Sequence, residues 1–163
     1  MQREAQIEVG MAKVEIAEAP SILFTRGLGS CVAIMIYEAH KKIGGLAHAM
    51  LPTINDARFK TNPAKFVDSA IAFMVEHLER KGCRRTDLQA KLVGGSHMFK
   101  TIPENSTLDI GMKNVKASQD TLTSYGIKIV GQDTRGNYGR TVFFDLNTGK
   151  ITIKTIFVGE KEI

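Results

Sequence analysis

The stretch TRGLGSCVAIMIYEAHKKIGGLAHAML, residues 25–51, holds two apolar runs on either side of the polar segment EAHKK. Short apolar runs bounded by glycines and a polar turn are typical of strands, so we predict strands at 31–37 and 43–49 that pair as a hairpin. A turn centred on 38–41 places Cys31 directly opposite His48. A slip of two residues makes them diagonal neighbours on one face, whereas a slip of one residue separates them. The register of this hairpin therefore decides whether a thiol and an imidazole meet.

Polar and glycine-rich segments divide the rest of the chain into further elements. We predict strands at 7–16, where a phase slip indicates a bend or bulge, and at 21–25, 88–94, 127–130, 140–146 and 150–158. The last two are typical of a hairpin, turning at 147–149. Residues 27–29, Gly-Leu-Gly, form a turn that needs the conformational freedom of glycine.

Two amphipathic patterns predict helices between these strands. The first begins at Asn62-Pro63, a capping residue followed by proline at the first helical position, and runs to about Lys81. The second covers residues 109–125. Because consecutive strands outnumber helices, we predict an α+β fold with mixed, mostly antiparallel sheets covered by helices. The length and the absence of a repeat or linker predict a single domain over residues 1–163.

Composition limits the classes of partner. The chain carries 22 basic and 17 acidic residues, a net charge of +5, which raises the question of nucleic-acid binding. The basic residues are scattered, and we interpret the densest cluster, at 80–85, as a solvated helix end, so no nucleic-acid partner is expected. No apolar run approaches the ~18 residues that span a bilayer, and the start MQREAQIEVG has no apolar signal segment. We therefore expect a cytoplasmic protein with no direct membrane insertion.

Cys31 and His48 are the candidates for chemistry. An imidazole beside a thiol lowers the thiol pKa, so the pairing predicts a depressed pKa for Cys31 and not for Cys83. The glycine-rich turn before Cys31 could aim backbone N–H groups at an oxyanion. A nucleophile, a base and an anion-binding turn suffice for acyl transfer. The spacing alone equally allows a buried cysteine and a histidine that satisfies a hydrogen bond.

The other thiol and imidazoles carry weaker signals. Cys83 follows a glycine beside two arginines and reads as an incidental surface or boundary thiol. His40 and His77 are interpreted as solvated, and His97 as a packed loop residue that alternatively contacts a partner. No histidines or cysteines have zinc-ligand spacing, so we expect no metal site. The glycines at 27 and 29 lack the remainder of a dinucleotide-binding motif, and a strand follows them instead of a helix.

Five motifs, in order over residues 20–145, resemble those of the CheD family of chemoreceptor glutamine deamidases. TRGLGSCVA at 25–33 resembles the family's TLGLGSCVA, and LAHAMLP at 46–52 matches its AHxMLP. The other three segments are GGSHMF at 94–99, similar to GGAxMF, IGMKN at 110–114, similar to IGxRN, and DTRGNYGR at 133–140, similar to DTGGNxGR. Lys113 and Arg135 depart from the family's arginine and glycine. Both departures lie outside the catalytic motifs.

The resemblance implies a specific activity. Members of the family convert particular glutamines of chemoreceptors to glutamate with release of ammonia, and they bind a CheC-type phosphatase. Their fold is similar to that of the deamidase toxins of the cytotoxic necrotizing factor type. Carried over to this chain, the resemblance makes Cys31 the nucleophile, His48 the general base and Thr25 the residue that orients the imidazole, with no cofactor. The alternative is a regulatory module whose main task is to bind the phosphatase or the receptors.

Overall fold

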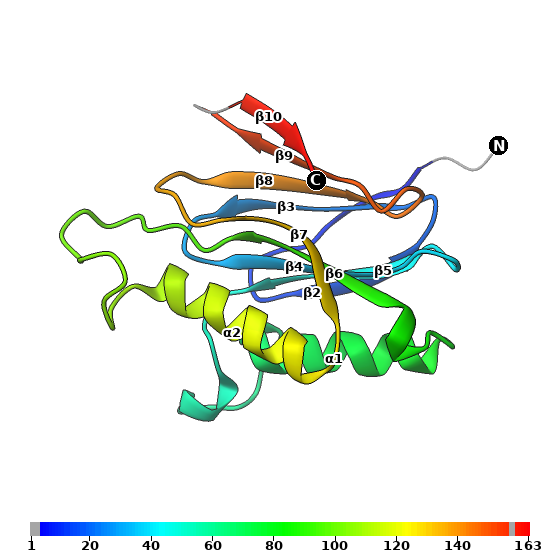
Figure 1. The fold of residues 1–163 in the computed structure, drawn as a ribbon, viewed down its shortest axis with the longest axis horizontal. Helices are drawn as coiled ribbons and strands as arrows, with labels where there is room; N and C mark the ends of the chain where they lie inside the picture. Colours follow the sequence, from blue (N-terminus) through cyan, green and yellow to red (C-terminus); the bar gives the residue numbers. More distant parts are fainter. Residues whose placement is uncertain (1–3, 157–158) are drawn as a thin grey trace.

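The computed structural model describes residues 4–156 and 159–163, which form two five-stranded sheets and two α-helices in three layers (Figure 1). The outer sheet has the strand order β1 (Gln6–Glu8), β3 (Ile22–Leu28), β8 (Arg140–Asp145), β9 (Ile151–Thr155) and β10 (Gly159–Glu162). The central sheet has the order β2 (Val14–Glu18), β5 (Ile43–Ala49), β4 (Val32–Glu38), β6 (Leu88–Gly94) and β7 (Lys128–Thr134). Helices α1 (Val67–Arg80) and α2 (Ile110–Ser124) cover the other side of the central sheet. This arrangement confirms the predicted α+β class.

Both faces of the central sheet are buried. Val32, Ile34 and Ile36 pack against the helices, whereas Ala33 and Met35, between them, pack against the outer sheet. Successive side chains of a strand point to opposite faces, so a strand that is covered on both sides must be apolar throughout. That requirement explains the unbroken run VAIMI in β4.

The helix starts lie close to the predicted positions. Asn62 does accept a hydrogen bond from the N–H of Ala64, at 3.2 Å, but it caps a short 3₁₀ turn at Pro63–Lys65. The α-helix itself begins at Val67, after an extended residue. Helix α2 begins after Asp109, whose carboxylate accepts from the N–H of Met112 at 3.0 Å. This is the usual way in which a side chain satisfies a free N–H of the first turn.

The β4–β5 hairpin forms where predicted but with a different register. Ala33 pairs with His48, and Glu38 pairs with Ile43, so the strands are shifted by two residues from a direct Cys31–His48 pair. Glu38 causes the shift, because its carboxylate accepts the N–H groups of His40 and Lys41 and closes the turn over 39–42. Cys31 and His48 are therefore diagonal neighbours on the same face, the alternative that keeps them within reach.

Several strand boundaries differ from the predicted ones. The expected bent strand at 7–16 is two strands, β1 and β2, which belong to different sheets. β3 continues through the expected glycine turn to Leu28, with Gly27 at φ +72° where the pairing with β8 is irregular. β7 is longer than predicted, and β10 was not predicted. The expected strand at 150–158 ends at Thr155, and residues 157–158 lie outside the described part of the chain.

Candidate active site

Two of the predicted site residues, Thr25 and His48, meet between the two sheets, and the third, Cys31, lies on the same face of the central sheet as His48. Thr25 lies in β3 of the outer sheet, and Cys31 immediately precedes β4. β5 runs antiparallel to β4, so its end returns His48 to the start of β4. Thr25 and His48 are fully buried, and Cys31 is 9% exposed.

A short chain of hydrogen bonds fixes the imidazole of His48. The Oγ1 atom of Thr25 lies 2.7 Å from Nδ1 of His48 and 2.6 Å from the carbonyl oxygen of Val9. A carbonyl only accepts, so the single hydroxyl proton of Thr25 is donated to Val9. The Nδ1 atom must then carry a proton and donate it to Thr25. The partners thus assign the tautomer in which Nε2 has a free lone pair.

The Nε2 atom of His48 is buried and has no hydrogen-bond partner among the described residues. An unsatisfied buried nitrogen costs stability, so a native structure that keeps one calls for an explanation. Nε2 belongs to a side chain on the same sheet face as Cys31, one diagonal step away. The arrangement supplies a base whose lone pair is committed to no other group.

Burial sets the resting charge of this pair. It raises the pKa of the Cys31 thiol, although the N–H of Cys31 itself, which faces the sulfur, acts in the opposite direction. Burial also lowers the pKa of His48. Both changes favour the neutral thiol and the neutral imidazole over the ion pair. The prediction of a depressed pKa for Cys31 was therefore wrong, because it counted the imidazole and left out desolvation.

We expect alkylation of Cys31 by iodoacetamide to have a pH midpoint above ~8.5, the value of an unperturbed thiol. The thiolate is the nucleophile, and a raised pKa moves its appearance to higher pH. Cys83 is expected to behave in the same way, because burial raises its pKa too. Peptide mass spectrometry follows the two sites separately. A midpoint for Cys31 below that of a free thiol would show that an ion pair exists at rest.

Backbone contacts hold the turn before Cys31 against β6. The N–H of Gly95 donates to the carbonyl of Cys31 at 2.8 Å, and the N–H of Ser96 donates to that of Gly29 at 2.9 Å. A Cβ atom on Gly94, which has φ +108°, would lie 2.5 Å from the Cys31 carbonyl oxygen. Gly94 therefore allows β6 to approach the turn, whereas Gly95 allows the chain to approach α2, because a Cβ atom on it would overlap the side chain of Val115. Sequence reasoning missed this role, although the paired glycines were the available signal.

The side chain of Asn114 also contacts the turn, and sequence reasoning missed this as well. Its Nδ2 atom donates to the carbonyls of Ser30, at 2.9 Å, and Met50, at 3.0 Å. Met50 lies just beyond the end of β5, two residues after His48. One buried amide thus joins the segments that carry the thiol and the imidazole.

The two departures from the family motifs have different surroundings. Arg135 has φ +70°, the left-handed region that favours glycine, and its guanidinium binds Asp109 and the carbonyl of Gly95. Burial alone raises the pKa of Asp109, but hydrogen bonds from Arg135 and from two backbone N–H groups outweigh it and hold that pKa far below its usual range. Arg135 therefore joins the loop after β7 to the start of α2. Lys113 instead lines a groove of about 530 Å³ between residues 51–57 and α2.

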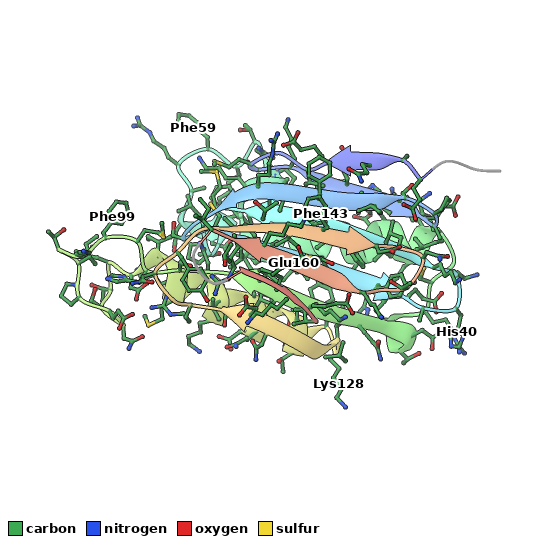
Figure 2. The ribbon with its side chains drawn as sticks, turned by 90° about the horizontal axis from the view of Figure 1, so that it is seen from above. His40, Phe59, Phe99, Lys128, Phe143 and Glu160 are labelled. Atoms are coloured by element: carbon green, nitrogen blue, oxygen red, sulfur yellow. The ribbon has the colours of Figure 1, made fainter. Side chains whose placement is uncertain are left out.

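The other thiol and the other imidazoles have different surroundings from those of Cys31 and His48. Cys83 is buried in the core on the helix side of the central sheet, so its interpretation as a surface or boundary thiol was wrong. His40 is exposed in the β4–β5 turn, at the end of the molecule opposite Phe99 (Figure 2). His77 is half-buried, stacks on Phe73 and donates from Nδ1 to the carbonyl of that residue. His97 lies 3.6 Å from Asp109. Within residues 4–156 and 159–163, no acidic, histidine or cysteine side chains form a group that could hold a metal ion.

Exposed aromatic side chains surround this end of the molecule. Phe99 is 62% exposed in the loop after β6, and Phe59 is 71% exposed in the loop after β5. Both project from the same end of the molecule (Figure 2). Met98 packs over Gly29 and lines a second hollow, of about 890 Å³, together with Gly27. The second hollow thus reaches the glycine turn before Cys31 through Gly27.

Comparisons with known proteins identify the family. Residues 50–155 match the family model described as CheD chemotactic sensory transduction. A Methanosarcina acetivorans protein named probable chemoreceptor glutamine deamidase CheD 1 is 47% identical over 157 residues, 96% of each chain. A Clostridium botulinum (strain Hall) protein named probable chemoreceptor glutamine deamidase CheD is 43% identical, over 97% of this chain and 98% of its own.

One solved structure can be aligned with part of this chain. The hypothetical protein YfiH of Bacillus licheniformis aligns with 74% of this chain and 49% of its own, at 14% identity and a TM-score of 0.44. No helix in the described part of the chain is long and apolar enough to cross a bilayer. The relatives cover nearly the full chain, and the family model begins two residues after His48. On these matches, the chain belongs to the CheD family.

Proposed function

We propose that this protein deamidates glutamine side chains of chemoreceptors, with Cys31 as nucleophile, His48 as general base and Thr25 as the residue that orients the imidazole. The names of its relatives support the substrate class. The observation that carries the catalytic assignment is the state of His48: its Nδ1–H is donated to Thr25, and its buried Nε2 has no partner in the part of the chain that the structure describes. That state matches the requirement for a base beside a thiol.

The first half of the reaction forms a thioester. Nε2 of His48 takes the thiol proton as the sulfur of Cys31 attacks the carboxamide carbon, and a tetrahedral adduct with a negative oxygen results. The imidazolium then gives its proton to the amide nitrogen. The carbon–nitrogen bond breaks and ammonia leaves. Because burial favours the neutral thiol and the neutral imidazole, we propose that the proton moves as the sulfur attacks the substrate carbonyl.

The second half of the reaction regenerates the thiol. Nε2 removes a proton from a water molecule, whose oxygen attacks the thioester carbon. The second tetrahedral adduct collapses with cleavage of the carbon–sulfur bond, and the proton returns to the sulfur. The product is a glutamate side chain, and the balance is one water consumed and one ammonia released. Residues of this chain supply every proton transfer, so the proposal includes no cofactor.

Backbone N–H groups of the turn are placed to bind the oxyanion. The carbonyls of Ser30 and Cys31 are engaged by Asn114 and Gly95, whereas the N–H groups of Ser30 and Cys31 donate to no carbonyl in the described part of the chain. The N–H of Cys31 faces its own sulfur. We propose that these two backbone donors beside the nucleophile bind the oxyanion, as backbone N–H groups do in other acyl transfers.

The proposed substrate is a helix of a receptor's cytoplasmic part, so the enzyme is proposed to act in the cytoplasm. Receptor modification sites flanked by acidic residues would be attracted by a protein of net charge +5. Such attraction raises the rate of encounter more than it raises specificity. We therefore expect binding to weaken with increasing salt, since screening shortens the range of these interactions.

Incubation with a receptor cytoplasmic fragment tests the function directly. Conversion of one glutamine to glutamate adds ~1 Da to a peptide and releases one ammonia, as the reaction class requires. Mass spectrometry locates the modified glutamines, and an ammonia assay gives the rate. A fragment with unchanged mass and no ammonia would contradict the proposed activity.

A second role, binding of a CheC-type phosphatase, is favoured by the loop after β6. Met98 and Phe99 are 44% and 62% exposed, so neither side chain is buried in the core. Exposed apolar side chains at the tip of a loop are typical of interaction sites. The phosphatase is proposed to bind this loop, next to the catalytic turn.

Replacing Phe99 by alanine is expected to weaken phosphatase or receptor binding by ~2 kcal/mol or more while the melting temperature stays nearly unchanged. The ring makes the interface contact but is mostly exposed in the free protein. Val130→Ala is the matched control, because Val130 is also exposed and lies in β7, near the opposite end of the molecule. Titration calorimetry and thermal unfolding give the two readouts. Unchanged affinity in the Phe99 variant would exclude the loop as the docking site.

A further inference from the structure

Asn114 is a fully buried polar residue to which nothing above assigns a step of the reaction. It lies in the second turn of α2, and both protons of its side-chain amide are donated to main-chain carbonyls, those of Ser30 and Met50. Its Oδ1 atom is buried and accepts no hydrogen bond in the described part of the chain. A buried amide oxygen without a hydrogen-bond partner lowers the stability of the fold. The presence of this amide at a buried position therefore calls for an explanation, which its two donated bonds can supply.

The contact with Ser30 bears directly on the catalytic turn. The carbonyl of Ser30 and the N–H of Cys31 belong to one planar trans peptide unit, in which they point in opposite directions. Asn114 binds the carbonyl from α2, so the N–H of Cys31 points away from α2. The next peptide is held independently, because the carbonyl of Cys31 accepts from Gly95.

The contact with Met50 ties the same amide to the strand end that carries His48. One side chain therefore joins the turn before β4 to Met50, which lies just beyond the last ladder pair of Val32 with Ala49. Such a group limits relative motion of the two segments. Misplacement of reacting groups by about 1 Å can cost ~10²-fold in rate.

We propose that Asn114 is a positioning residue for the deamidation: it holds the Ser30–Cys31 peptide so that the N–H of Cys31 binds the oxyanion. This inference rests on the proposed function. Asn114 does not touch the substrate, and it acts through the turn. A packing role alone would be met as well by an apolar side chain of similar size, without a buried unsatisfied oxygen.

Asn114→Ala is expected to lower kcat for receptor deamidation by ~10²-fold, as loss of an oxyanion donor does, with KM nearly unchanged. Alkylation of Cys31 by iodoacetamide provides the readout that separates positioning from general damage. That reaction displaces iodide from a saturated carbon and forms no oxyanion, so its rate should stay within about threefold of wild type. The site of labelling is verified by mass spectrometry of the Cys31 peptide.

Ser118→Ala is the matched control, because Ser118 is equally buried on α2 and donates to the carbonyl of Asn114 without touching the turn. Its kcat should remain within about threefold of wild type. If Asn114→Ala does not fold, Asn114→Ser replaces it, because serine leaves a smaller void than alanine and keeps one hydrogen-bond donor. The serine variant is also expected to lose deamidation rate but not alkylation rate.

Three results would overturn the inference. Deamidation by a folded Asn114 variant at nearly the wild-type rate contradicts it, and so does an equal fall in deamidation and alkylation. A comparable loss in Ser118→Ala would show that the rate follows helix packing instead. These results leave the proposed function intact. By contrast, a wild-type protein that releases no ammonia contradicts the proposed function, and the inference then falls together with it.

Discussion

Replacing Cys31 by alanine is expected to abolish ammonia release from a receptor fragment, with a loss of ~10⁴-fold or more, as for removal of the nucleophile from other covalent hydrolases. No thioester can form without the sulfur, and water alone would have to attack a poorly reactive amide. The thiol sits at a strand end with 9% exposure, so the substitution should cost only about 1–2 kcal/mol of unfolding free energy. Thermal unfolding and partner binding should therefore remain close to those of wild type.

Cys83→Ala is the matched control for this experiment. It removes the other thiol, which is also buried but lies on the helix side of the central sheet. Full activity in Cys83→Ala together with none in Cys31→Ala assigns the chemistry to one thiol. Conversion of receptor glutamine by Cys31→Ala at a rate comparable with wild type would refute the nucleophile.

The hairpin illustrates how far local sequence determines this fold. The run VAIMI and the strand at 43–49 were predicted from apolar residues bounded by turn residues, and the structure confirms both strands. The register was two residues off, because the carboxylate of Glu38 closes the turn one position later than the polar segment indicated. The positions of strands follow from the pattern of apolar residues. The exact position of a turn, and with it the register, depends on single hydrogen bonds.

Other features depend on contacts that are distant in sequence. Asn114 reaches Ser30, and Gly95 reaches Cys31, across separations that no periodicity encodes. The sequence also did not show that β1 and β2 belong to different sheets. A break in the alternation of apolar and polar residues is the same for a bulge within one strand as for a boundary between two strands. The pKa of Cys31 was mispredicted for a related reason: the degree of burial is a property of the assembled layers.

The proposed catalytic residues were predicted partly from strand spacing and partly from the family resemblance. Spacing allowed a Cys31–His48 pair, since both lie near ends of adjacent strands. Thr25 had no signal of its own, because it belongs to the other sheet and its contact with His48 crosses between sheets. The geometry now gives that threonine a physical task. Its hydroxyl decides which nitrogen of the imidazole is protonated.

Thr25→Val is expected to lower kcat by about 10²- to 10³-fold while KM stays nearly unchanged. Loss of a charged partner that fixes the tautomer of a catalytic histidine costs up to ~10⁴-fold, and a neutral hydroxyl should contribute less. Valine has nearly the shape of threonine but cannot accept the Nδ1–H of His48 or donate to Val9. The imidazole then has no partner that keeps its proton on Nδ1, and the lone pair on Nε2 is no longer assured. KM should hold because Thr25 is fully buried and does not touch the substrate.

Thr25→Ser is the matched variant, since serine keeps the hydroxyl that Thr25 uses and removes only a methyl group. Its kcat should lie within about tenfold of wild type, so activity should follow the hydroxyl and not the bulk of the side chain. The kcat and KM of both variants are measured on the same receptor fragment. Unfolding is monitored as well, because Thr25→Val leaves the Nδ1–H of His48 and the carbonyl of Val9 unpaired, at a cost of about 1–3 kcal/mol each. A folded Thr25→Val protein with wild-type kcat would mean that the ring of His48 is oriented by its packing. Equal losses in the valine and serine variants would point instead to the missing methyl contacts.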